Sequence, residues 1–116
     1  GIFFESGSIS NVLIGGVAAS EGNTISGGND AIDLRAVSNI RIRGNTIAAS
    51  NQRGIYLNNV STVEIGGASA GQGNSIGGNG TDGIYATNSS TNLTILGNSI
   101  QPIATIGGAP SIEMSV

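Results

Sequence analysis

The stretch Ile65–Ile76 (IGGASAGQGNSI) has a near copy upstream, because Ile14–Ile25 reads IGGVAASEGNTI. Both copies consist of IGG, five variable residues, Gly-Asn, a hydroxyl residue and Ile. The shorter phrase Gly-Asn-Thr/Ser-Ile recurs along the chain, beginning at Gly22, Gly44, Gly73 and Gly97. A phrase repeated at intervals of 20 to 30 residues indicates a solenoid or a similar array of stacked units.

Two further phrases alternate with this one. A small residue followed by Ile and an alternating pair begins at Gly1, Ala31, Gly54 and Gly83. A second alternating segment occupies Asn11–Ile14, Asn39–Ile42, Thr62–Ile65 and Asn92–Ile95. Alternation with a period of two predicts a half-buried strand. Three such strands per repeat predict one coil of a parallel β-helix, in which equivalent strands of successive coils pair about 4.8 Å apart.

The alternation also predicts which side chains point into the core. We expect this core to consist of Ile2, Phe4, Val12, Ile14, Ile25, Ile32, Leu34, Ile40, Ile42, Ile47, Ile55, Leu57, Val63, Ile65, Ile76, Ile84, Ala86, Leu93, Ile95 and Ile100. Most of them are Ile or Val, whose branched side chains stack well in columns.

The chain is expected to form a single all-β domain over residues 1–116, with four to five coils. Long and short coils alternate, since only the two IGG copies carry a Gly/Ala/Ser-rich loop, and these loops are expected to protrude from one corner at every second coil. Residues 1–53 and 54–105 then form an internal duplication, and 106–116 a partial last coil. In that last coil, Ile106-Gly107-Gly108 is predicted to restart the second-strand phrase, and Ser111–Val116 to form one more strand.

Composition narrows the classes of function. The net charge is −3, only 9% of residues are charged, and Lys, His, Cys and Trp are absent. Four Arg and no Lys argue against a nucleic-acid partner, which needs a cluster of cations. No apolar run approaches the roughly 18 residues of a membrane span, so we expect no membrane insertion. Scarce charge with abundant Ser, Thr and Asn favours an extracellular or cell-surface location.

Residues 31–47, 54–67 and 83–100 (AIDLRAVSNIRIRGNTI, GIYLNNVSTVEIGG and GIYATNSSTNLTILGNSI) resemble the right-handed parallel β-helix repeat superfamily. That group includes secreted bacterial and archaeal solenoids with carbohydrate-binding or sugar-hydrolase repeats, polysaccharide lyases and epimerases, and bacterial surface proteins. The resemblance implies a right-handed helix over nearly the whole chain. It implies less about function, because the shared residues belong to the scaffold.

The four Gly-Asn phrases place an Asn at the same point of successive coils. We expect Asn23, Asn45, Asn74 and Asn98 to form an internal ladder, in which each amide pairs with turn backbone groups and with its neighbour. The ladder is structural rather than a ligand site.

Residues 77–85 (GGNGTDGIY) match the calcium-binding nonapeptide pattern GGxGxDxUx. Such sites need tandem copies that complete one Ca²⁺ shell, and residues 27–35 (GGNDAIDLR) depart from the pattern. The interpretation is therefore that no cofactor is bound. If calcium binds, the ligands are Asp82 and, from the other segment, Asp30 and Asp33.

The sequence lacks the residue clusters that catalysis on this fold requires. Lyases and epimerases of the resembled fold need clustered carboxylates, a metal, or a His, Tyr or Lys base beside an Arg. The seven carboxylates are scattered, so we predict no catalytic residues and no enzyme activity in this chain. Arg41 and Arg43 alternate on an outward face, where Glu64 of the next coil is expected to form an ion pair with one of them. An acidic-sugar contact at these Arg residues is the alternative.

Tyr56 and Tyr85 occupy matching outward positions. They are expected either to stack on each other across coils or to contact a glycan together with Asn58 and Asn88. Four Asn-x-Ser/Thr sequons, at Asn59, Asn79, Asn88 and Asn92, are expected to lie in loops or to point outward, where glycosylation is sterically allowed.

Three functional hypotheses remain open. The first is a non-catalytic extracellular structural module that stacks head to tail with itself into filaments, or that continues into adjoining coils of a longer stalk. The second is a carbohydrate-binding module that recognises a polysaccharide. The third is a non-catalytic fragment of a polysaccharide lyase or epimerase.

Overall fold

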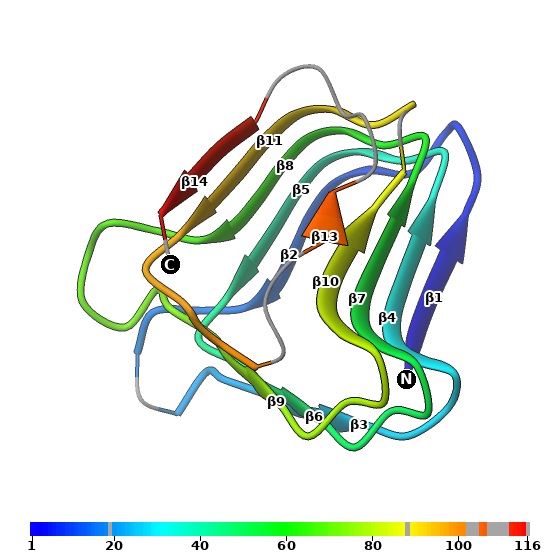
Figure 1. The fold of residues 1–116 in the computed structure, drawn as a ribbon. Coiled ribbons are helices and arrows are strands. Elements are labelled where there is room, and N and C mark those ends of the chain that lie inside the picture. The colour runs from blue at the N-terminus through cyan, green and yellow to red at the C-terminus, as the bar shows by residue number, and fades with distance from the viewer. Residues whose placement is uncertain (19, 88, 102–104, 107–111, 116) are drawn as a thin grey trace.

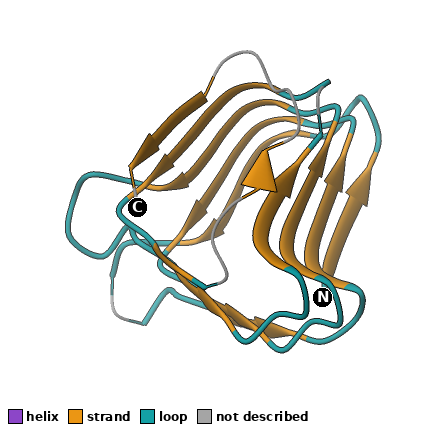
Figure 2. Cartoon of the chain, viewed as in Figure 1, coloured by secondary structure: helices purple, strands orange, loops and turns teal. Residues whose placement is uncertain are grey.

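The chain winds as a three-sided parallel β-helix (Figure 1). The structure, a computed structural model, describes residues 1–18, 20–87, 89–101, 105–106 and 112–115. These residues contain strands and loops but no helix (Figure 2), and so none that could cross a membrane.

Each side of the prism is one parallel sheet. The first sheet contains β1 (Ile2–Glu5), β4 (Asp30–Arg35), β7 (Arg53–Asn58), β10 (Asp82–Ala86) and β13 (Thr105–Ile106). The second sheet contains β2 (Ser10–Gly15), β5 (Ser38–Arg43), β8 (Ser61–Gly66), β11 (Thr91–Leu96) and β14 (Ile112–Ser115). The third sheet contains β3 (Thr24–Ser26), β6 (Thr46–Ala48), β9 (Ser75–Gly77) and β12 (Ser99–Ile100).

The register of the strands stacks like residues in columns. In the first sheet Ile32 pairs with Ile2 below and Ile55 above, and Ile55 pairs with Ile84. The expected core is confirmed in the middle coils, where these inward Ile side chains are fully buried. At the outer coils the inward side chains are only partly buried against it; these are Ile2, Phe4, Val12 and Ile100.

The expected core lacked three buried residues: Ala31 in β4, next to the inward Ile32, and two Val residues in turns. Val37 and Val60 are buried at the corner between the first and second sheets, where the chain turns between strands. They lie outside any alternating segment, so a strand pattern cannot find them.

A ladder of Asn side chains lines the corner between the second and third sheets. The backbone N and the Nδ2 of Asn45 donate to Oδ1 of Asn74 at 2.9 and 3.1 Å, and those of Asn74 donate to Oδ1 of Asn98, both at 2.9 Å. Asn23 donates to Oδ1 of Asn45 in the same way, at 3.0 and 3.1 Å. The ladder therefore runs through four consecutive coils.

In three of the four ladder residues Nδ2 also donates to the preceding coil. Asn45 bonds the carbonyl of Ile14 at 3.0 Å, Asn74 that of Ile42 at 2.9 Å, and Asn98 that of Ile65 at 2.9 Å. Asn45 and Asn74 are each 2% exposed and use both amide hydrogens and two acceptor sites of Oδ1. One side chain thus joins three coils with no unpaired polar atom in the turn.

The first Gly of the Gly-Gly pair in each long coil lies against the ladder, and the second lies against the side chain that closes the loop, Glu21 or Gln72. A Cβ at Gly15 would lie 2.6 Å from Oδ1 of Asn45, and one at Gly66 would lie 2.6 Å from Oδ1 of Asn98. Both glycines also have positive φ, +91° and +86°, which side-chain-bearing residues rarely adopt. A Cβ at Gly15 or Gly66 would also overlap the backbone carbonyl of Arg43 or Leu96 in the next coil, so the first Gly of the IGG phrase suits both its left-handed backbone and this close approach.

The two long loops extend from this same corner, as expected (Figure 1). Each is closed by the last variable residue of the repeated phrase: Oε1 of Glu21 accepts from the N of Ala18 at 3.0 Å, and Oε1 of Gln72 accepts from the N of Ser69 at 3.0 Å. The carbonyl of Gln72 also accepts from the N of Gly44 at 3.2 Å, so the second loop packs on the short coil before it.

The expectation that Ile106 begins a second-sheet strand is wrong. Ile106 belongs to β13 and pairs with Ala86 in the first sheet, not in the second. The chain returns to the first sheet after β12, as it does in every earlier coil, so the place in the coil decides the sheet and the likeness to the IGG phrase does not. Gly107 and Gly108 lie outside the described residues. The strand expected near the end is β14, which joins the second sheet beside β11.

A second column, on the outside of the second sheet, was not expected. The second residue of each of its first four strands has positive φ, between 54° and 60°; these are Asn11, Asn39, Thr62 and Asn92. Nδ2 of Asn39 donates to Oδ1 of Asn11, and Nδ2 of Asn92 donates to Oγ1 of Thr62 at 3.1 Å. Asn tolerates this left-handed conformation, whereas a β-branched Thr is strained there.

Replacement of Thr62 by Asn should therefore stabilise the protein. We expect Thr62→Asn to raise the free energy of unfolding by about 1 kcal/mol, because backbone strain of this kind costs on the order of 1–3 kcal/mol. Urea unfolding followed by circular dichroism measures the change. Thr94→Asn in β11 is the control and should be neutral or destabilising, because Asn is disfavoured in an ordinary strand. A less stable Thr62→Asn protein would show that the conformation is not strained.

Candidate functional site

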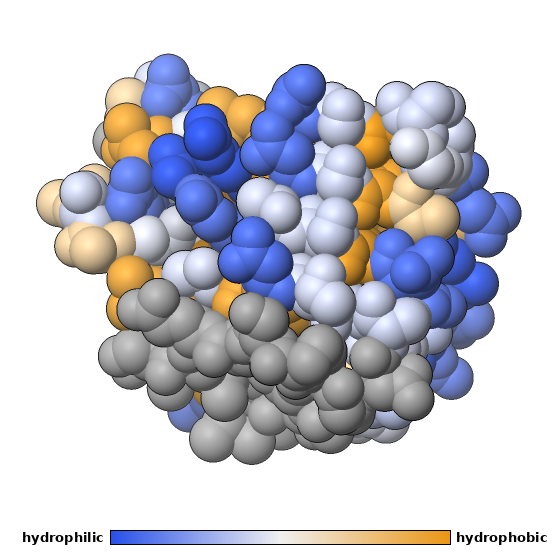
Figure 3. Space-filling view, turned by 90° about the horizontal axis from the view of Figure 1, so that it is seen from above, coloured by the Kyte–Doolittle hydropathy of each residue, from blue (hydrophilic) through white to orange (hydrophobic). Residues whose placement is uncertain are grey.

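The outer face of the first sheet gathers aromatic and charged side chains in three columns. The middle column contains Phe3, Asp33, Tyr56 and Tyr85. The column on one side contains Asp30, Arg53 and Asp82, and the column on the other contains Glu5, Arg35 and Asn58. Seen from above, hydrophilic residues gather along the side of the molecule that carries this sheet (Figure 3).

Two Arg side chains lie between the aromatic rings. The guanidinium carbon of Arg35 lies 5.6 Å from the ring centre of Phe3 and 5.3 Å from that of Tyr56. That of Arg53 lies 4.0 Å from Tyr56 and 5.6 Å from Tyr85. Each contact of this kind contributes about 0.5–1 kcal/mol at an exposed site.

The same two Arg bind carboxylates with paired hydrogen bonds. Arg53 holds Asp30 through Nε at 2.7 Å and through a terminal nitrogen at 3.0 Å, and the side chain of Asp30 is only 4% exposed. Arg35 holds Asp33 on its own strand at 2.9 and 3.0 Å. The hydrogen bond that Arg53 donates to Asp30 raises the pKa of Arg53 above the usual value for Arg, and the one that Arg35 donates to Asp33 does the same for Arg35. Desolvation acts in the opposite direction on both. Two parallel hydrogen bonds between a guanidinium and a carboxylate fix the orientation of both side chains.

The three expected calcium ligands do not meet in a metal shell. Asp30 and Asp82 are both in register with Arg53, so a guanidinium lies in the strand between them. Asp33 is bound to Arg35. Among the described residues no group of three or more Asp and Glu is placed to hold a metal ion. That no calcium is bound stays a prediction, for which calorimetry is the test.

Tyr56 and Tyr85 lie in register, with ring centres 6.0 Å apart and planes tilted by 31°. They contact each other across coils, which was one of the two expectations. Asn58 accepts a hydrogen bond from Oγ1 of Thr87 at 3.3 Å. Asn88 lies outside the described residues.

The sequons differ in their surroundings. Asn59 is exposed in the turn before β8, and Asn92 is exposed on β11. Asn79 lies in the loop between β9 and β10, one of the two expected placements, but its side chain is buried, at 8% exposed. Its Oδ1 accepts from the N and the Oγ of Ser50 at 3.1 and 2.8 Å, and its Nδ2 is buried close to Gly54. Asn79 is thus a second internal tie between coils.

The outward Arg of the second sheet pair with Glu64, as the repeat indicated. A terminal nitrogen of Arg43 lies 2.9 Å from Oε2 of Glu64, and Nε of Arg41 lies 3.6 Å from the same atom. The side chains of Arg41 and Glu64 are 54% and 42% exposed, so this network contributes little to stability.

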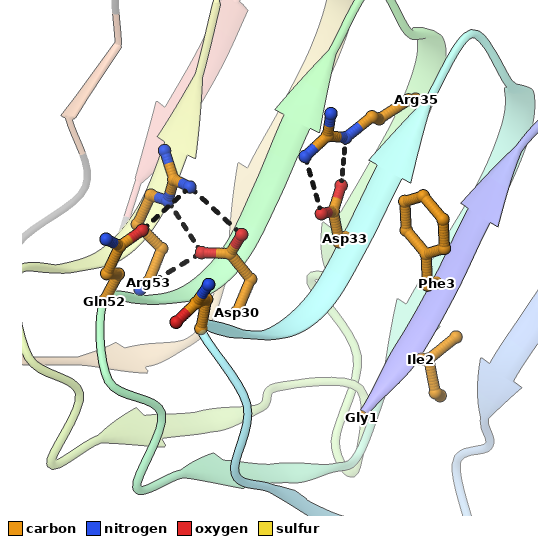
Figure 4. A pocket seen from close by; sticks show the side chains of 9 residues that line it. Gly1, Ile2, Phe3, Asp30, Asp33, Arg35, Gln52 and Arg53 are labelled. Carbon is orange, nitrogen blue, oxygen red and sulfur yellow. Dashed lines mark hydrogen bonds and ion pairs between the residues drawn. The ribbon is translucent and has the colours of Figure 1, made fainter.

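The structure adds a feature that the sequence did not indicate: a hollow of about 340 Å³ on the first-sheet face. The Asp30–Arg53 pair with Gln52 lies on one side of it, and Asp33, Arg35 and Phe3 lie on the other (Figure 4). Arg53 and Asp30 are 23 positions apart and meet only because parallel register aligns them. The one available signal was their shared position, two residues before the inward Ile of the strand.

The chain matches the family model described as a right handed beta helix region over residues 1–108, and it therefore belongs to the right-handed β-helix family. The three parallel sheets agree with this assignment. No curated protein and no solved structure matches the chain significantly.

The Arg53–Asp30 pair can be tested through stability. Arg53→Met leaves a nearly buried carboxylate without its cation, and we expect it to lower the free energy of unfolding by about 1.5–3 kcal/mol. Arg41→Met, which removes an exposed partner, is the control and should change stability by less than about 0.5 kcal/mol. Denaturant unfolding measures both. Equal losses of unfolding free energy in the two variants would mean that the Arg53–Asp30 pair stabilises the protein no more than an exposed ion pair does.

Proposed function

We propose that this β-solenoid is a non-catalytic structural module of an extracellular or cell-surface protein. The observation that carries the proposal is the continuous Asn ladder, which joins four coils and satisfies the buried corner. A scaffold of this kind keeps its shape without a cofactor or a disulfide. Abundant Ser, Thr and Asn and the absence of Lys support an extracellular location.

The pairing of the carboxylates supports a non-catalytic role. A general acid or base needs a carboxyl group that is free to exchange a proton with substrate at the working pH. Asp30 and Asp33 each accept paired hydrogen bonds from a guanidinium, so both oxygens of each carboxylate are already engaged by a side chain of the protein. The chain has no His or Lys to act in their place.

Association with a further coil would complete the structural role. Among the described strands, β1, β2 and β3 lie at one edge of their sheets and each pairs on one side only. The exposed large apolar residues, Phe3, Leu13 and Val17, also lie in this coil. In the ladder each Oδ1 accepts from the coil before it, so Oδ1 of Asn23 is the acceptor for such a coil. The adjoining coil would come from a second copy or from the same polypeptide.

Carbohydrate binding is the second candidate function. It is favoured by the hollow on the first-sheet face, which combines a half-exposed aromatic ring with carboxylate, guanidinium and amide groups. Sites for small polar ligands have this mixture of apolar surface and a few placed polar groups.

Head-to-tail association is tested by sedimentation velocity and electron microscopy over a concentration series of the purified chain. We expect the average mass to rise with concentration and filaments to form, with a fibre reflection near about 4.8 Å from strands stacked across the junctions. Particles that stay monomeric at every concentration would contradict self-association and leave the adjoining coil to the same polypeptide.

A further inference from the structure

The hollow on the first-sheet face offers hydrogen-bond donors and acceptors side by side. A carboxylate has about four acceptor sites and a guanidinium five N–H donors, so the Asp30–Arg53 pair has capacity beyond its own three hydrogen bonds. Gln52 adds an amide whose Oε1 accepts from Arg53 at 3.2 Å. Neighbouring hydroxyl groups of a sugar ring match such an arrangement, because one donates to the carboxylate while the next accepts from the guanidinium.

Phe3 supplies the apolar part of the hollow. Its side chain is 58% exposed, and it lies on the opposite side of Asp33 from Tyr56. Phe3 has one guanidinium near its ring, that of Arg35 at 5.6 Å, whereas Tyr56 has two, at 5.3 and 4.0 Å. The C–H face of a sugar can therefore reach Phe3, whereas the ring of Tyr56 is already occupied by Arg35 and Arg53.

The charge of the site selects among sugars. The two carboxylates and two guanidinium groups that line the hollow cancel formally. Glu5 and Asp82 lie on the same face, and the whole chain carries −3. A uronic acid or a sulfated sugar would meet net negative charge, while a neutral ring would lose no charge interaction on entering.

The hollow is of a size for one ring rather than for a long segment. Its volume of about 340 Å³ is near the lower end of the roughly 300–1,000 Å³ typical of small-molecule sites. Its partners are also preorganised, because Asp30 and Asp33 are each fixed by paired hydrogen bonds.

From these observations we infer that the hollow between Phe3, Asp33 and the Asp30–Arg53 pair binds one ring of a neutral glycan. The inference rests on the carbohydrate-binding candidate function and specifies its site and its sugar class. Phe3 packs on the ring, and Asp30, Arg53 and Gln52 bind its hydroxyl groups. The second-sheet Arg residues and the Tyr56–Tyr85 pair take no part.

The test is a binding screen of the whole chain against neutral hexose oligosaccharides and uronic-acid oligosaccharides of equal length. Hits are measured by calorimetry or by ligand-observed NMR. We expect neutral oligosaccharides to bind more tightly than acidic ones, with an affinity that changes little with salt, since no ion pair forms with the ligand.

Variants then locate the site. Phe3→Ala and Gln52→Ala remove exposed groups and should each weaken binding about tenfold. Leu13→Ala is the matched control, because Leu13 is 55% exposed on the second sheet of the same coil. It should leave the affinity unchanged, and so should Tyr85→Ala. Unfolding curves of all four variants confirm that the fold is retained.

The possible results distinguish an error in the proposed binding site from an error in the proposed carbohydrate-binding function. Neutral-glycan binding that survives both Phe3→Ala and Gln52→Ala would overturn the site while the carbohydrate function stands. Tighter binding of the uronic-acid series would overturn the sugar class. A screen in which no oligosaccharide binds would overturn the carbohydrate function, and this inference with it.

Discussion

A buried corner with backbone polar groups is the constraint on which this fold depends. In the middle coils the chain turns between the second and third sheets at a point that neighbouring coils cover, so the N–H and C=O groups around Asn45 and Asn74 are shielded from water. An Asn side chain can pair these groups, because its amide carries two N–H donors and an oxygen that accepts two hydrogen bonds. In Asn45 and Asn74 all of these are used, across three coils.

Other features of the chain follow from this arrangement. Gly15 and Gly66 are needed because a Cβ would enter the space of the Asn amides. The loops of the long coils leave from the same corner and are closed by Glu21 and Gln72. Because the ladder fixes the stacking of the coils, it also fixes the register of the first sheet, and with it the meeting of Arg53 and Asp30. The candidate site is therefore held by the same hydrogen bonds that hold the fold.

The sequence alone predicted the features that follow from alternating residues and from repeated phrases. Alternation identified the strands and most of the core, and the repeated Gly-Asn phrase placed the Asn ladder. It did not find Val37 and Val60, which are buried in turns, or the positive φ of Thr62, which no repeat reveals. The sequon pattern does not reveal that the side chain of Asn79 is buried, because that burial depends on its hydrogen bonds to Ser50 in the coil before it. The hollow depends on contacts between coils and on side-chain rotamers, which a single sequence does not show.

The most direct test of the ladder is the unfolding free energy of Asn74→Leu in urea, compared with Asn23→Leu. Leu branches at Cγ as Asn does but has no polar atoms, so the buried substitution leaves N–H and C=O groups of three coils unpaired. The ladder predicts a loss of about 2 kcal/mol or more for Asn74→Leu, and a clearly smaller loss at the exposed Asn23. Unfolding of Asn74→Leu at the same urea concentration as the unsubstituted protein would contradict the claim that this ladder holds the coils together.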